Sequence, residues 1–173
     1  WKRNAELDSH KFAVYVDDYN HEVHVALKGT SDKHDILSDA HVMFDNTSGH
    51  EKEIQTYLES VIDYYDGQEY NFDVSSHSLG STELINIFTN EKNDKLDQYK
   101  EIRLFNPAVM PTHNLSNAKN ALHDKRMFFF LNSGDMVSNT YGNLADQDSQ
   151  VMWIESTHNP LHNHGIAQWV GDV

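Results

Sequence analysis

A serine flanked by small residues lies where a predicted strand gives way to a helical pattern. Ser78 comes two positions after Ser76 and two before Gly80, which is the spacing of a nucleophile elbow, a sharp strand-to-helix turn that holds a serine hydroxyl. The flanking positions must be small because the backbone of such a turn is strained. A helix beginning here would direct backbone N–H groups toward the hydroxyl. The alternative is an ordinary serine N-cap.

Two further strand ends carry residues suited to acyl transfer. Gly29 and Thr30 follow one predicted strand, and Asp135 follows another. Gly29 would let the backbone approach closely, and Thr30 could offer its N–H and hydroxyl to an oxyanion. Asp135 could orient a histidine, with Asp146 and Asp148 as the next acids along the chain. Both positions are also typical of simple turns.

A serine hydroxyl needs a base to take its proton, and the chain has 12 histidines. Three of them, His158, His162 and His164, lie close together near the carboxyl end. Each could be the base, and together they could also ligate zinc. No carboxylate lies at tight ligand spacing beside them, which disfavours the zinc site.

The apolar pattern predicts an N-terminal hairpin and then helices alternating with strands. Residues 12–16 and 22–27 alternate as two strands. Apolar residues recur at intervals of three and four over residues 51–65, which predicts an amphipathic helix. A strand over residues 70–74 then leads into the helix that begins at Ser78.

The second half of the chain continues this alternation. The unbroken apolar run at 127–131 is typical of a strand buried on both faces. The other predicted elements are strands at 102–105 and 151–154, helices at 116–123 and 164–170, and a charged loop at 90–98. Strands that alternate with helices after a hairpin indicate a single α/β domain, residues 1–173, with a mainly parallel sheet. In such sheets the working residues lie at the carboxyl ends of the strands.

Composition excludes several classes of function. The formal net charge is −14, which disfavours nucleic acid and anionic lipid surfaces as partners. The chain has no cysteine, which excludes disulfides and thiolate zinc sites. No apolar run approaches the length of a membrane span, so we expect a soluble chain with no integral membrane segment. The first residue is Trp1 rather than methionine, which leaves room for an upstream segment such as a signal peptide.

Several motifs together resemble those of the class 3 lipases of the α/β-hydrolase superfamily. The family elbow usually reads Gly-His-Ser-Leu-Gly-Gly, and residues 76–81 read Ser-His-Ser-Leu-Gly-Ser. The family loop Arg-Gly-Thr and a later aspartate are matched by Lys28-Gly29-Thr30 and Asp39. The family Gly-Asp turn after an apolar strand is matched by Gly134-Asp135. Residues 164–169, His-Gly-Ile-Ala-Gln-Trp, look like the histidine motif near the carboxyl end of some relatives.

This resemblance implies a minimal α/β-hydrolase fold with a triad in which Ser78 attacks, His164 is the base and Asp135 orients the base. The oxyanion hole would combine the N–H of Leu79 with Thr30. No metal or other cofactor is implied. The chain departs from the family in having serines for two elbow glycines, a lysine for the loop arginine, and a short stretch between acid and histidine.

The expected function is hydrolysis of a carboxylic ester through an acyl-enzyme, with a small-molecule ester or a lipid as substrate. The segment after the oxyanion loop, residues 31–40, is short and polar with several charges, which favours an esterase or a lipase without a large lid. A peptidase or an acyltransferase could use the same triad. A catalytically inactive hydrolase fold that binds a partner is the alternative from another class. Oligomeric state and compartment do not follow from the sequence.

Overall fold

Seven strands form a single sheet in chain order in the computed structural model, which describes residues 1–29, 47–90, 92–108, 115–135 and 139–155. The strands are β1 (Lys2–Arg3), β2 (Phe12–Asp17), β3 (Glu22–Leu27), β4 (Asn71–His77), β5 (Tyr99–Phe105), β6 (Met127–Asn132) and β7 (Val151–Ile154). The helices are α2 (Thr47–Tyr64), α3 (Leu79–Asn90), α4 (Leu115–His123) and α5 (Asn139–Leu144), with a 3-10 helix, η1 (Leu96–Gln98), before β5.

The sheet is mixed, with its antiparallel part at the N-terminus. Strands β1, β2 and β3 pair antiparallel, whereas each neighbouring pair from β3 to β7 is parallel. The predicted α/β class, with a mainly parallel sheet and an N-terminal hairpin, is therefore confirmed. Both strands of the hairpin were predicted, and buried residues alternate strictly with half-buried ones along each of them.

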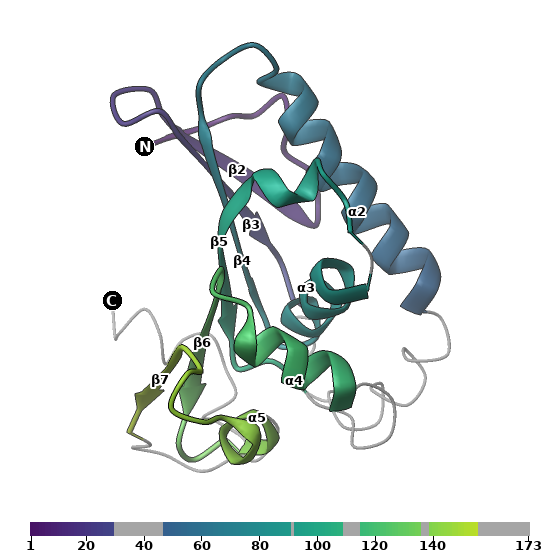
Figure 1. Cartoon of the computed structure of the whole chain (residues 1–173). Helices are drawn as coiled ribbons and strands as arrows, with labels where there is room; N and C mark the ends of the chain where they lie inside the picture. Colours follow the sequence, from purple (N-terminus) through teal and green to yellow (C-terminus); the bar gives the residue numbers. More distant parts are fainter. Residues whose placement is uncertain (30–46, 91, 109–114, 136–138, 156–173) are drawn as a thin grey trace.

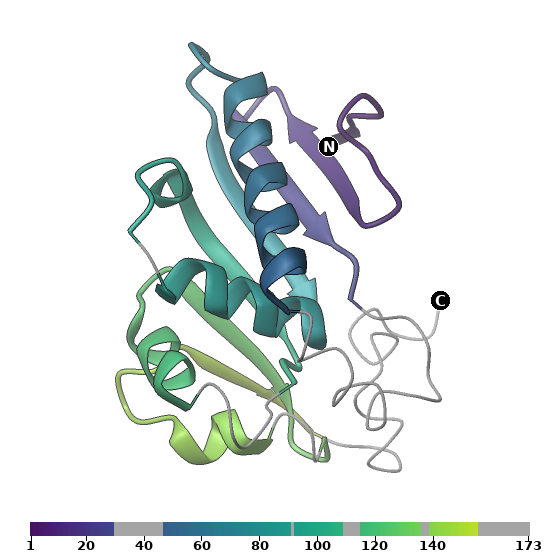
Figure 2. The same cartoon turned by 90° about the vertical axis from the view of Figure 1, so that its right-hand side faces the viewer.

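All four described helices lie on one face of the sheet, as the edge-on view of Figure 1 and the turned view of Figure 2 show. The strand order explains this arrangement. Each crossover from β3 to β7 steps to the next strand in the same direction, and right-handed crossovers then place every helix on the same side. The described sheet therefore contains no reversal of strand order, the feature that creates a ligand crevice in doubly wound sheets.

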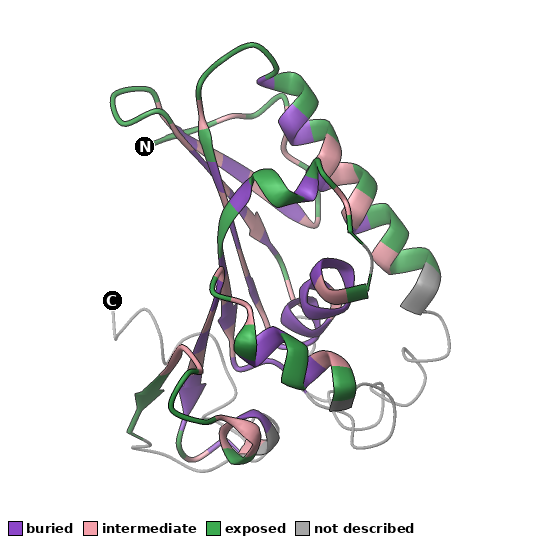
Figure 3. Cartoon of the chain, viewed as in Figure 1, coloured by how far each residue is buried: buried purple, intermediate pink, exposed green. Residues whose placement is uncertain are grey.

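Burial follows this one-sided arrangement (Figure 3). Along β2, β3 and β4, side chains alternate between buried positions toward the helices and half-buried positions on the opposite face. The same alternation occurs in β6, where Phe128 and Phe130 are only half-buried. The expectation that residues 127–131 are buried on both faces is wrong, because the described helices cover only one face.

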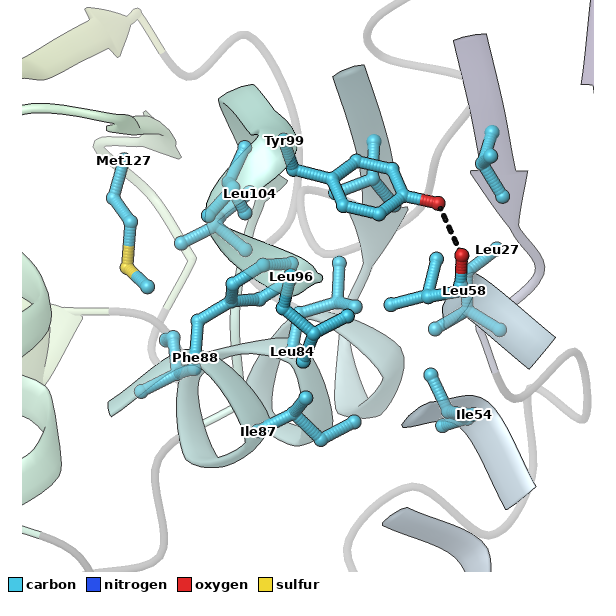
Figure 4. Close-up of a cluster of buried hydrophobic side chains, with 14 of the residues drawn as sticks. Leu27, Ile54, Leu58, Leu84, Ile87, Phe88, Leu96, Tyr99, Leu104 and Met127 are labelled. Carbon is cyan, nitrogen blue, oxygen red and sulfur yellow. Dashed lines mark hydrogen bonds between the residues drawn. The ribbon is translucent and has the colours of Figure 1, made fainter. Parts of the chain in front are cut away.

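Tyr99 lies at the centre of the core between the sheet and the helices (Figure 4). Its ring is fully buried, and its hydroxyl donates a hydrogen bond of 3.0 Å to the carbonyl of Leu58 on α2. This contact holds the start of β5, which begins three residues before the predicted strand. Leu96 of η1 is buried in the same cluster. The segment 90–98, predicted as a solvated loop, therefore contributes to the core.

Two helices differ from the sequence-based expectation. Helix α2 begins at Thr47 and includes Gly49 and His50, because one glycine costs a helix only about 1 kcal/mol relative to alanine and the packing of the apolar face offsets it. Helix α5 has no periodic apolar pattern and was not predicted. Its Tyr141 is buried, with its ring centroid 5.3 Å from that of Phe129 on β6, so a contact distant in sequence stabilises this short helix.

The remaining predicted elements agree closely with the structure. Helix α4 begins one residue before the predicted helix at 116–123, and β7 has the predicted bounds. The predicted helix at 164–170 lies outside the described residues. Within the described ranges, no helix combines the length and the apolar character needed to cross a membrane.

Candidate active site

Ser78 lies at the sharp turn between β4 and α3. Its φ is +57°, in the left-handed region that non-glycine residues adopt at a cost of about 1–3 kcal/mol. The serine is fully buried, and its N–H donates a hydrogen bond of 3.0 Å to the carbonyl of Phe105 at the end of β5. An ordinary N-cap residue has an extended backbone instead. The backbone of Ser78 therefore matches a nucleophile elbow better than a simple cap.

The positions two residues either side of Ser78 are packed against each other. A Cβ on Gly80 would lie 2.2 Å from Oγ of Ser76 and 3.4 Å from Cδ2 of Leu27, so glycine is required there. Ser76 donates its hydroxyl to the carbonyl of Leu27 at 3.1 Å, which joins the ends of β3 and β4. Serine can replace the usual first glycine because Gly80 has no side chain and Leu27 supplies an acceptor.

The end of β3 approaches the elbow closely. A Cβ on Gly29 would lie 2.2 Å from the backbone oxygen of His77, so the chain before Thr30 is in contact with the residue before Ser78. Thr30, the predicted oxyanion residue, and Asp39 lie outside the described residues. The close approach at Gly29 directs the start of this loop toward the elbow.

Leu79, the other predicted oxyanion residue, is the first residue of α3 and is buried. Helix geometry gives the N–H groups of a first turn no acceptor within their own helix. The N–H groups of Ser81 and Thr82 donate to the carbonyl of Ser78 at 3.1 and 3.3 Å. The helix therefore begins directly after Ser78, with its positive dipole end at the serine.

Asp135, the predicted acid, is fully buried just after β6. Its N–H donates to the carbonyl of Asn132 at 3.0 Å, which closes a tight turn. Because β4, β5 and β6 are adjacent and parallel, Ser78 and Asp135 lie at the same edge of the sheet. The alternative acids Asp146 and Asp148 precede β7, so they lie toward the opposite edge.

The predicted base and its alternatives, His164, His162 and His158, all lie outside the described residues. The alternative zinc site depends on the same three histidines. In the described part of the chain, no three histidine, aspartate or glutamate side chains are grouped closely enough to hold a metal ion.

A second polar cluster, which the sequence did not indicate, lies on the half-buried face of the sheet. On β3, Nδ1 of His24 contacts the Asp73 carboxylate, and Nε2 of the same ring lies 2.9 Å from Oγ of Ser75. Arg103 on β5 lies 3.3 Å from the same carboxylate. We call these four residues the Ser75 cluster. Its only sequence signal is polar residues at alternate positions of β3 and β4, which become neighbours through the strand register.

A pocket of about 570 Å³ adjoins this cluster. Its lining residues are Trp1, Tyr15, Glu22, His24, Asn71, Phe72, Asp73, Lys100, Glu101 and Arg103. Both signs of charge are present, and Arg103 also lies 2.5 Å from Glu101. This pocket lies along the amino-terminal parts of β3, β4 and β5, whereas Ser78 lies beyond the carboxyl end of β4.

The elbow helix also carries a partly buried acid. Oε1 of Glu83 lies 3.2 Å from Nδ1 of His50 on α2. Burial raises the pKa of the Glu83 carboxyl, and the neighbouring His50 imidazole opposes that rise. The exposed Glu53, by contrast, accepts a hydrogen bond of 2.7 Å from Lys11, which lowers the pKa of that carboxyl. The fold therefore shifts the pKa values of these two carboxyls in opposite directions.

No family model matches the sequence, and no curated protein matches it. Among solved structures, the chain is similar to one from a structural analysis of two fungal esterases from Rhizomucor miehei and their substrate specificity. The TM-score is 0.48 and the sequence identity 13%, over 71% of this chain and 53% of that one. The chain therefore spans about half the length of the esterase that it matches.

Proposed function

We propose that the chain is a serine carboxylic-ester hydrolase with Ser78 as its nucleophile. The observation that carries this proposal is the left-handed backbone of a buried serine, φ +57°, between a parallel strand and the start of a helix. Strain of this kind persists only where the surrounding structure enforces it, and it is concentrated at functional sites. Helix capping alone would not require that strain.

The buried carboxyl of Asp135 supports the same reading. A buried carboxylate is costly unless it is paired, and an imidazolium is the partner that a hydrolase would supply. We assign Asp135 as the acid that holds His164 in the productive tautomer and stabilises its charged form. His164 is assigned from the sequence motif, with His162 and His158 as the alternatives.

The proposed reaction has two acyl-transfer steps. His164 takes the hydroxyl proton as Ser78 Oγ attacks the ester carbonyl, which forms a tetrahedral oxyanion. The C–O bond to the alcohol then breaks, and His164 gives the proton to the leaving oxygen. In the second step a water molecule, deprotonated by His164, attacks the acyl-enzyme, and the carboxylic acid is released with regeneration of Ser78.

We assign the oxyanion hole to the N–H of Leu79 and to Thr30. The contact between Gly29 and the backbone of His77 supports this assignment, because it brings the loop before Thr30 against the elbow. Each donor of this kind is worth about 2.7–4 kcal/mol of barrier. The short polar segment at 31–40 favours small esters over emulsified lipid.

A fluorophosphonate probe tests the proposal without a known substrate. We expect one adduct, on the peptide containing Ser78, when the intact chain is labelled at neutral pH and digested for mass spectrometry. Labelling should weaken at about pH 5, because a histidine base is then protonated. An adduct on Ser75 instead would overturn the assignment of Ser78 as nucleophile. No adduct on folded protein would overturn the proposal and favour a non-catalytic binding module.

A further inference from the structure

A continuous path of hydrogen bonds joins the ends of β4, β5 and β6. The N–H of Ser78 donates to the carbonyl of Phe105 at 3.0 Å, and the N–H of Asn106 donates to the carbonyl of Phe130 at 2.9 Å. The end of β5 is thus bonded to the elbow on one side and to β6 on the other. A displacement at the end of β5 would therefore alter hydrogen bonds at the ends of both β4 and β6.

The side chain of Asn106 extends this path to the turn that carries Asp135. Its Oδ1 accepts the N–H of Asn132 at 2.9 Å. Asn132 in turn accepts the N–H of Gly134 through its own Oδ1 at 3.0 Å, and the N–H of Asp135 through its carbonyl at 3.0 Å. Two asparagine side chains therefore shape the turn that holds the buried acid.

Core packing alone would not favour asparagine at either position. Asn106 is fully buried with a φ of +41°, a left-handed conformation that asparagine tolerates better than most side chains. Asn132 is 1% exposed, and its Nδ2 has no acceptor among the described residues. A buried donor without an acceptor is unfavourable, so stability alone does not account for an amide at this position.

We propose that Asn106 and Asn132 act as a pair of positioning residues, which hold Asp135 at a fixed distance from the elbow through β5. This inference rests on the proposed hydrolase function, because it assigns Asp135 a role in the reaction. The backbone of Ser78 bonds to Phe105, and the turn that carries Asp135 bonds to the next residue, Asn106. Removal of the amide should leave the serine in place and misalign the acid.

Asn106→Gly is the most direct variant, because glycine keeps access to the positive φ and removes the side chain with its Oδ1 acceptor. Asn93→Gly is a matched control, since Oδ1 of Asn93 also accepts backbone N–H groups, from Lys95 and Leu96 at 3.1 and 3.3 Å. Asn93 precedes β5 and so lies away from the elbow. Asn132→Ala is a second test that leaves the strained residue untouched.

The measurement is kcat and KM on a p-nitrophenyl ester, together with the rate and final stoichiometry of fluorophosphonate labelling at Ser78. For Asn106→Gly and Asn132→Ala we expect kcat to fall about 10- to 100-fold with little change in KM. The labelling rate should fall in parallel, while the final stoichiometry stays that of the wild type. Full stoichiometry separates misalignment from a loss of folded protein, and Asn93→Gly should match the wild type in every measurement.

The outcomes separate the two proposals. Without labelling of wild-type Ser78, the hydrolase function fails and this inference fails with it. If the wild type is labelled and both variants keep wild-type kcat and labelling rate, the function stands and the positioning role is overturned. If Asn106→Gly does not fold, Asn132→Ala alone decides in the same way.

Discussion

Two serines three residues apart in the sequence have very different surroundings. Ser75 has the contacts of a triad, because Oγ lies 2.9 Å from His24 Nε2, and Nδ1 of the same ring contacts the Asp73 carboxylate. However, Ser75 lies in the middle of β4 with regular strand pairing on both sides. Ser78 lies beyond the end of that strand, with a left-handed backbone and a helix beginning at the next residue.

This difference lies in the backbone around each serine, because the contacts of Ser75 with His24 and of His24 with Asp73 lack the backbone donors that an oxyanion needs. Within a parallel sheet, the backbone N–H groups around Ser75 are used by the neighbouring strands, so none can stabilise an oxyanion there. The pocket beside the Ser75 cluster is lined by His24 and Asp73 and not by Ser75 itself. A strand end followed by a helix provides the donors that the middle of a strand lacks.

The strongest test of this comparison is to remove each hydroxyl in turn. Ser78→Ala should lower kcat/KM for ester hydrolysis by about 1,000-fold or more, because no other group replaces the nucleophile, whereas Ser75→Ala should change it by less than about twofold. Activity on a p-nitrophenyl ester measures both. Loss of activity in Ser75→Ala, with Ser78→Ala still active, would reverse the assignment of the two serines.

Backbone packing at the elbow provides the second test. Alanine at Gly29 would place a Cβ 2.2 Å from the backbone oxygen of His77, so the ends of β3 and β4 must separate. We expect Gly29→Ala to destabilise the fold by about 1–3 kcal/mol and to slow labelling of Ser78. Denaturant unfolding measures the first effect and fluorophosphonate labelling the second.

Gly49 is the matched control for that substitution. It lies in α2, and among the described residues no atom outside its own stretch of helix lies within 4 Å of the position that its Cβ would occupy. Gly49→Ala should stabilise the fold by about 0.5–1 kcal/mol, the difference in helix propensity. Equal destabilisation by both variants would mean that the close approach at Gly29 has no special role.

Removal of a charge from the Ser75 cluster should affect stability and not activity. Asp73→Asn weakens the contacts to His24 and Arg103, whose side chains are 21% and 34% exposed, so we expect a loss of about 1 kcal/mol. Asp18→Asn is the control, because its pair with Lys2 is highly exposed and should contribute nothing measurable. A large loss of esterase activity in Asp73→Asn at unchanged stability would show that the cluster takes part in the reaction.

The sequence predicts the elbow and the hairpin because their signals are local. Alternating apolar residues define β2 and β3, and the small residues around Ser78 are adjacent in sequence. The edge shared by Ser78 and Asp135 follows from the parallel sheet that alternating elements predict. The roles of Ser78, Leu79 and Asp135 remain predictions. So do those of the base and Thr30, which lie outside the described residues.

Features that depend on register and distant packing were not predictable in the same way. His24 meets Asp73 and Ser75 across 49 and 51 residues of sequence, and a shift of one residue in the pairing of β3 and β4 would separate them. Tyr99 extends β5 because its hydroxyl reaches Leu58, 41 residues away. The sequence next to these residues gives no signal for either contact, because each contact joins residues that are far apart in the chain.

The smallest predicted effect concerns the two acids near the elbow helix. Burial raises the pKa of the Glu83 carboxyl above its usual 4.5. The free energy that protonated Glu83 contributes to folding is therefore fully present below about pH 4.5, and it is lost as the pH rises through the folded-state pKa. The side chain of the Glu83→Gln variant cannot ionise, so this variant does not lose that stability as the pH rises. The free energy of unfolding of Glu83→Gln, relative to the wild type, should therefore increase as the pH is raised above 4.5.

Glu53 provides a control of opposite sign at the same edge of the molecule. The hydrogen bond from Lys11 lowers the pKa of Glu53, so its contribution is present above the unfolded-state pKa and is lost as the pH falls through the folded-state pKa. Relative to the wild type, Glu53→Gln should be least stable near neutral pH, and the deficit should shrink on acidification. Urea unfolding of both variants from pH 4 to 8 tests the pair, and slopes of the same sign would show that burial does not control the ionisation of Glu83. Opposite slopes would support burial as the cause of the raised pKa of Glu83 and the Lys11 hydrogen bond as the cause of the lowered pKa of Glu53.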